Sequence, residues 1–109
     1  MWHNEYMLDA DLIDRSARLL LAASPAGSRV IVFGSQARGD ARHGSDLDLM
    51  VIEPEVRSRM AEAARLARVL RPLRIPADIV VISSGEFEIW KDAPNNVFYY
   101  AHREGRLIA

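Results

Sequence analysis

The sequence predicts a single α/β domain with three strands and four main helices. Three short apolar runs have the length of buried strands and cover residues 29–33, 46–52 and 77–82. Apolar residues recur at helical spacing in four longer segments, which cover residues 8–23, 55–70, 84–92 and 96–104. All five prolines fall at the predicted boundaries, which supports this segmentation. We therefore interpret the 109 residues as one domain, residues 1–109.

Composition narrows the class of protein. Half of the residues are apolar and 27% are charged, as in an ordinary globular protein, and the net charge of −1 gives no drive toward nucleic acid. The absence of cysteine excludes disulfides and thiolate metal sites. The first residues lack the pattern of a signal peptide, and the longest apolar run is five residues. We therefore expect a cytoplasmic protein that binds neither membranes nor nucleic acid directly.

The first helix and the first strand are separated by a clear stop signal. Acidic residues come early in segment 8–23 and basic residues come later, which suits the dipole of a helix. Residues 24–28, Ser-Pro-Ala-Gly-Ser, then end the helix. The strand predicted over residues 29–33 follows directly.

This strand leads into a glycine-rich turn over residues 34–45. At Gly34 the backbone can turn sharply or approach a ligand closely, because glycine has no side chain. Ser35 is then predicted to cap a short helical turn over residues 36–38. The unpaired N–H groups at the start of a helix suit a phosphate. The turn is thus a candidate phosphate-binding element.

Two aspartates follow this turn where the next strand is predicted to begin. Asp46 and Asp48 are two residues apart, so on a strand both carboxylates face one way. Carboxylate and phosphate oxygens are ligands that Mg²⁺ prefers. An Asp-x-Asp pair alone more often lies on a solvated strand face. The longer pattern, Gly-Ser, ten residues and then Asp-x-Asp between two apolar strands, favours a metal site.

A third carboxylate opens the strand predicted over residues 77–82. Asp78 is the only polar residue in this strand, and a buried aspartate is costly unless it is paired or bound to metal. The alternative is an aspartate at the end of a strand that is exposed to water.

Arginines gather on and after the helix predicted over residues 55–70, which Pro54 is expected to open. They give this stretch a basic face that is either a solvated surface or a contact with an acidic partner or RNA. These arginines are Arg57, Arg59, Arg65, Arg68, Arg71 and Arg74.

The last part of the chain has recognisable helix ends. Ser83 and Glu86 have the spacing of a capping box, and Gly105 is predicted to end the last helix in a left-handed conformation before an extended tail over residues 106–108. In the helix of residues 96–104 one stripe is predicted to pack inward, comprising Val97, Tyr100, Ala101 and Glu104. Phe98, Tyr99 or His102 would then remain outside for a partner, unless the core needs every aromatic residue.

The turn and its carboxylates resemble the signature of the polymerase-β-like nucleotidyltransferase superfamily. Within it, the chain looks like a minimal nucleotidyltransferase, the small type often encoded beside a HEPN-domain protein as its antitoxin. The residues that fall on the pattern are Gly34, Ser35, Arg38, Gly39, Arg42, Ser45, Asp46 and Asp48. The similarity extends through Asp78 to residues 103–108. The resemblance also implies that the sheet is mixed.

The resemblance implies a metal-dependent transfer of AMP from ATP with release of pyrophosphate. Asp46 and Asp48 would be ligands of two Mg²⁺ ions, and Asp78 would complete the shell of the catalytic ion near the acceptor hydroxyl. The nucleotide would be bound by five residues of the turn, Gly34, Ser35, Arg38, Arg42 and Ser45.

The resemblance also implies a partner, a helical HEPN-type RNase toxin. The expected acceptor is a hydroxyl of that partner, a tyrosine near its RNase site, and the modification would silence the toxin. Two alternatives remain open. The chain is an antitoxin that neutralises its partner by covering it, or it is a nucleotidyltransferase for a small molecule such as an aminoglycoside. We disfavour the last, because relatives of that kind usually carry a further substrate-binding domain.

Overall fold

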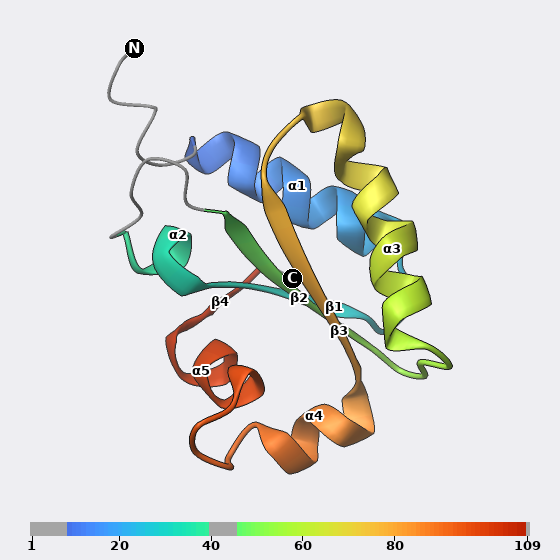
Figure 1. Ribbon diagram of the computed structural model, residues 1–109, viewed down its shortest axis with the longest axis vertical. Coiled ribbons are helices and arrows are strands. Elements are labelled where there is room, and N and C mark those ends of the chain that lie inside the picture. Colours follow the sequence, from blue (N-terminus) through green and yellow to red (C-terminus); the bar gives the residue numbers. More distant parts are fainter. Residues whose placement is uncertain (1–8, 40–45, 109) are drawn as a thin grey trace.

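A mixed sheet of four strands forms the centre of the protein (Figure 1). The computed structural model describes residues 9–39 and 46–108. The strands lie in the order β3-β2-β1-β4. β2 is antiparallel to β1 and parallel to β3, and β4 is antiparallel to β1. Their bounds are Arg29–Phe33 for β1, Leu47–Glu53 for β2, Ala77–Ser83 for β3 and Arg106–Leu107 for β4.

Helices cover both faces of this sheet (Figure 1). α1 and α3 pack on one face, where Leu20 and Leu66 join the larger core cluster. α4 and α5 pack on the other face through Phe87 and Ala101. The helices are α1 (Ala10–Ala22), α2 (Gly34–Arg38), α3 (Arg59–Leu70), α4 (Ser84–Trp90) and α5 (Val97–Glu104), with a 3₁₀ turn at Arg71–Leu73. Among the described residues, no helix has both the length and the hydrophobicity that a membrane span needs.

The fourth strand corrects the prediction of three. Residues 106 and 107, expected to be part of an extended tail, pair with β1 opposite Val32 and Ile31. Two residues are too few to give a periodic signal in the sequence. Gly105 is extended, at φ −79°, so the predicted left-handed stop is wrong. A Cβ there would collide with the Ala101 carbonyl and with Ile31, so glycine allows α5 to approach β1 closely.

The helix starts follow the side chains that can cap them. α3 begins at Arg59 rather than at residue 55, because the Ser58 hydroxyl accepts a bond from the Ala61 N–H at 3.2 Å. The predicted cap at Ser83 is confirmed, since its hydroxyl accepts from the Glu86 N–H at 3.2 Å. Asn96 caps α5 by accepting from the N–H groups of residues 98 and 99.

The rotation of α5 differs from the predicted one. Val97 and Tyr100, expected in the buried stripe, are 38% and 44% exposed. Phe98 packs against the core instead, next to the buried Ala101. The small Ala101 lets the helix backbone approach β1, and this contact turns Phe98, three residues earlier, toward the sheet.

One acidic side chain is buried where β2 ends. Glu53 is only 2% exposed, and its Oε2 atom has no hydrogen-bond partner within residues 9–39 and 46–108. Burial, together with a hydrogen bond to Glu62 and repulsion from it, raises the pKa of Glu53 to about 7. Glu62 binds the Arg65 guanidinium through both carboxylate oxygens, at 2.8 and 2.7 Å, and this lowers the pKa of Glu62 to about 2. Glu53 therefore keeps its proton in slightly acidic solution.

We expect this proton to make stability depend on pH. The pKa of Glu53 is raised from an ordinary 4.5 to about 7. The protonated Glu53 side chain therefore makes its full contribution to stability below pH 4.5, and this contribution is lost as the pH rises through 7. Glu53→Gln cannot ionise, so at about pH 8 it should be more stable than the wild type by on the order of 2 kcal/mol. Thermal unfolding followed by circular dichroism at several pH values measures this.

The exposed Glu55→Gln variant is the control for this experiment, because it makes the same chemical change two residues away. Its pH profile should follow that of the wild type. If Glu53→Gln also lost stability in parallel with the wild type between about pH 5 and about pH 8, the protonated Glu53 would be ruled out.

Candidate functional site

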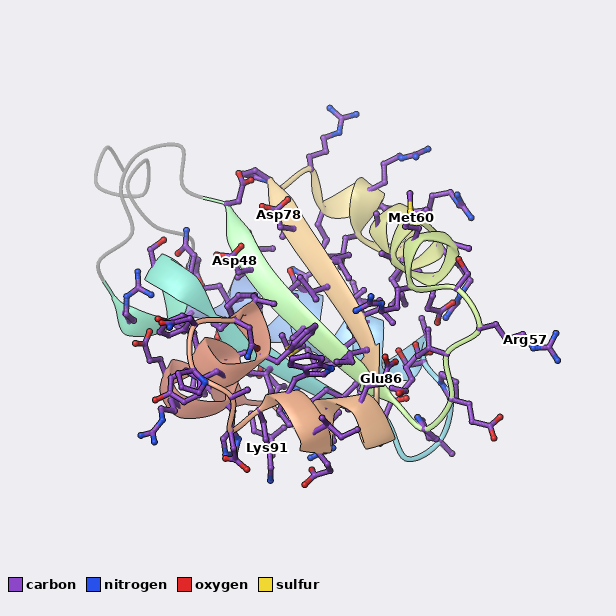
Figure 2. The ribbon with its side chains drawn as sticks, turned by 60° about the horizontal axis from the view of Figure 1, so that its bottom comes forward. Asp48, Arg57, Met60, Asp78, Glu86 and Lys91 are labelled. Atoms are coloured by element: carbon purple, nitrogen blue, oxygen red, sulfur yellow. The ribbon has the colours of Figure 1, made fainter. Side chains whose placement is uncertain are left out.

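Two aspartates lie in register on neighbouring strands. Asp48 of β2 pairs with Asp78 of β3, and the two strands are parallel. Residues in register on parallel strands project to the same face of a sheet. Here it is the face of α4 and α5, because Met50, two residues after Asp48, belongs to the cluster with Phe87. Figure 2 shows both aspartates at the end of the sheet opposite to the start of α4.

The remaining predicted carboxylate, that of Asp46, lies just outside the sheet. Asp46 is exposed and precedes β2, which begins at Leu47, so its predicted place on the strand is wrong by one residue. The backbone stays close to β3 at this point, because the Leu47 N–H donates to the Pro76 carbonyl at 2.9 Å. Asp46 also hydrogen-bonds with Asp78. Asp46 therefore lies beside Asp78, and its charge also reaches Asp48.

Electrostatic repulsion links these carboxyl groups. Burial raises the pKa of Asp48, repulsion from Asp78 and Asp46 raises it further, and Arg38 lowers it. Burial, repulsion from Asp46 and the hydrogen bond with Asp46 raise the pKa of Asp78. The charged forms of Asp48 and Asp78 are thus less stable at this site than in water. A cation placed between them would remove this repulsion.

The backbone of Gly34 lies directly against the side chain of Asp48. Its φ of +73° is a conformation that other residues rarely adopt. A Cβ on Gly34 would fall on the Asp48 Oδ2 atom and 3.1 Å from the Asp48 Cγ atom. The sequence predicts a close approach to a ligand at this glycine, and the structure shows a close approach to a side chain of the site. Glycine at position 34 therefore allows the Asp48 carboxylate to occupy its place.

The short helix α2 follows Gly34. It begins at Gly34 itself, so Ser35 is not its N-cap and lies half-buried in its first turn. Arg38, in the last turn, forms an ion pair with Glu104 of α5 at 3.4 Å. Its positive charge also reaches Asp48, whose pKa it lowers. Arg42 and Ser45, predicted to bind nucleotide, lie outside the described residues.

A depression of about 520 Å³ extends from this turn to α5. It is lined by Phe33, Gly34, Arg38, Val97, Tyr100 and Glu104. The three α5 residues in this lining, Val97, Tyr100 and Glu104, are not among the predicted site residues. Their helical spacing predicts a common face of the helix, but spacing alone does not tell whether that face is buried in the core or lines a site. The stripe faces a hollow beside Gly34.

The carboxyl groups provide the type of donor atom that binds a divalent cation. In the described parts of the chain, no three or more His, Cys, Asp or Glu side chains are close enough together to hold an ion as they stand. Their donor atoms are nevertheless carboxylate oxygens, which Mg²⁺ prefers, and Asp48 and Asp78 are adjacent on a half-open face. Burial raises the pKa of Asp48 and Asp78, and repulsion from neighbouring aspartates raises it further, so a cation would offset part of this effect. We conclude that the residues fit Mg²⁺.

Comparisons with known proteins found one matching family model and a solved structure with a similar fold. The family model described as "Nucleotidyltransferase domain" matches residues 13–103. A solved structure from Sulfolobus solfataricus, provisionally described as a nucleotidyltransferase, is similar with a TM-score of 0.57 and 21% sequence identity. The match covers 89% of this chain and 76% of that chain, and at this identity it shows the fold alone. No curated protein matches the chain.

The contact between Gly34 and Asp48 predicts a difference between two glycines. Gly34 and Gly39 both have positive φ, but a Cβ on Gly39 would meet nothing within 4 Å. Gly39→Ala should therefore cost about 1 kcal/mol of backbone strain. Gly34→Ala adds a collision with Asp48 and should cost at least about 2 kcal/mol. Denaturant unfolding of both variants measures the difference, and equal losses would contradict the close fit.

Proposed function

The chain belongs to the nucleotidyltransferase domain family, and on that premise we propose that it transfers AMP from ATP to a hydroxyl group at a Mg²⁺ site. The observation that carries this proposal is the register of Asp48 with Asp78 beside Gly34. Nucleotidyl transfer needs little covalent chemistry from a protein. It needs neutralised phosphate charge and an in-line arrangement of the reacting groups, and a row of carboxylates beside a phosphate-binding turn suits both.

The three carboxylates have distinct roles in this proposal. Asp46 and Asp48 would be the shared ligands of two Mg²⁺ ions, and Asp78 would complete the shell of one. Bound Mg²⁺ would neutralise the phosphates and polarise the bond that breaks. Asp78 would also lie near the attacking hydroxyl, where a carboxylate can accept the proton that the hydroxyl loses.

The turn and the depression would hold the nucleotide. The N–H groups at the start of α2, with Ser35, would contact the terminal phosphates. Arg38 would offset their charge, and its ion pair with Glu104 would hold it at the site. The depression toward α5 offers room for the base and ribose, with Tyr100 at its wall. Arg42 and Ser45 stay predicted members of this group.

The acceptor we propose is a hydroxyl on a HEPN-type RNase, and the chain would act as its antitoxin. The resemblance in the sequence supports this, and so do exposed apolar side chains on α4 and α5. Ile89 is 70% exposed and Trp90 is 47% exposed, which favours a protein contact on this side. The alternatives are an antitoxin that neutralises its partner by binding alone and a nucleotidyltransferase for a small molecule.

We expect transfer to require both aspartates in register. Asp48→Asn or Asp78→Asn should lower the rate of Mg²⁺-dependent AMP transfer at least about a hundredfold while the fold stays intact. The control is Asp92→Asn, an exposed aspartate between α4 and α5. Incubation with labelled ATP, Mg²⁺ and the co-encoded partner, followed by the intact mass of the partner, measures transfer. Full turnover in a folded Asp48→Asn, Asp78→Asn double variant would refute the assignment.

The same measurement separates the three functions. A mass increase equal to AMP that needs ATP, Mg²⁺ and Asp48 supports the modifying antitoxin. Tight binding that blocks the RNase without a mass change, under the same conditions, favours the antitoxin that acts by covering its partner. Transfer to an aminoglycoside but not to the protein favours the small-molecule enzyme.

A further inference from the structure

A groove that the proposed chemistry does not use runs between α3 and the outer edge of β3. It consists of two depressions, of about 310 and about 190 Å³, and Ile79 lines both of them. The α3 side is formed by Arg59, Met60, Ala63, Ala67 and Leu70, which recur at helical spacing, and Arg71 follows. The β3 side is formed by Ala77, Ile79, Val80 and Val81. We call this the α3–β3 groove.

The outer edge of β3 lies in this groove and pairs with no other strand in the described part of the chain. In the described ranges β3 pairs only with β2, because it is the outermost strand of the order β3-β2-β1-β4. Residues 77–80 are half-buried or exposed, whereas Val81 and Ile82 are buried. On its outer side, this half of the edge strand has backbone N–H and C=O groups without a strand partner among the described residues. Such an edge is a template for another extended chain.

The groove is apolar along its length. Met60 is 85% exposed, and Figure 2 shows it on α3. Ala63 and Ala67 are small and leave space between the helix and the strand, and Ile79 lies at the centre. Every second side chain of an added strand would point toward this apolar surface. The groove therefore fits an extended segment with apolar residues at alternate positions.

The charged side chains of the groove indicate which residues should flank that segment. Arg59 lines one depression and Arg71 lines the other, and among the described residues no acidic side chain lines either. A second copy of the chain would bring the same arginines together, and repulsion disfavours that pairing. RNA is also disfavoured, because no aromatic residue of the described chain lines the groove to stack with a base. An acidic protein segment is complementary.

We propose that the α3–β3 groove docks an extended, apolar segment of a partner protein that is flanked by acidic residues and adds to β3 as a fifth strand. This assigns a role to part of the arginine-rich face. Because β3 also carries Asp78, the docked segment would lie along the strand of the candidate site. The docking does not depend on nucleotide transfer, so either proposal can fail without the other.

A synthetic peptide tests the docking directly. The probe is a fluorescein-labelled peptide with an alternating valine–threonine core and two glutamates at each end. Fluorescence anisotropy should show saturable binding to the wild type. The Arg59→Glu, Arg71→Glu double variant should bind at least about tenfold more weakly.

The Arg57→Glu, Arg68→Glu double variant is the matched control. It makes the same change in net charge around α3, but both arginines line a different depression, together with Glu53 and Glu62. Its affinity for the peptide should stay within about twofold of the wild type. Thermal unfolding of each variant establishes that it is folded.

A second readout tests the added strand. The bound peptide should slow hydrogen exchange of the amides in residues 77–80, and a peptide with N-methylated backbone amides should not bind. The proposal is overturned if the acidic peptide does not bind, or if the control variant weakens it equally. It is also overturned if a peptide with lysine ends binds as well. Binding of oligouridine through Arg59 and Arg71, without binding of the peptide, would make the groove an RNA surface instead.

Discussion

The parallel register between β2 and β3 is the constraint on which the candidate site depends. It places Asp48 opposite Asp78, and it exists because the chain crosses through α3 between the two strands. The antiparallel pairing of β1 with β2 positions the glycine-rich turn at the site, since it brings Phe33 opposite Asp48. Gly34, the next residue, can then lie against the Asp48 carboxylate. A shift of β3 by one residue would turn Asp78 to the other face.

This arrangement gives the site its charge and leaves it open. The core clusters lie on both faces of the sheet, but the end of β2 and β3 with the aspartates is the half-open part. Burial raises the pKa of Asp48 and Asp78, repulsion from neighbouring aspartates raises it further, and Arg38 offsets part of the shift of Asp48. A site of this kind gains stability from a bound cation. This is in keeping with the proposed metal-dependent reaction at these residues.

The sequence predicted the parts of this site that depend on local pattern. The long spacing from Gly34 and Ser35 to Asp46 and Asp48 is specific, and the three strands are apolar runs of clear length. What it missed depends on contacts far apart in the chain. The rotation of α5, the extended conformation of Gly105 and the pairing of β4 all follow from the approach of α5 to β1. The burial of Glu53 is likewise a contact between strand and helix that no local spacing reveals.

The most direct test of the account is to find where a divalent cation binds. Mn²⁺ can replace Mg²⁺ at oxygen ligands, and it broadens the nuclear magnetic resonance signals of nearby amides. We expect a small amount of Mn²⁺ to broaden the amide signals of Gly34, Asp48 and Asp78, and excess Mg²⁺ to restore them. The Asp48→Asn variant should show no broadening there. Broadening centred on other residues, or unchanged broadening in that variant, would contradict a metal site at the paired aspartates.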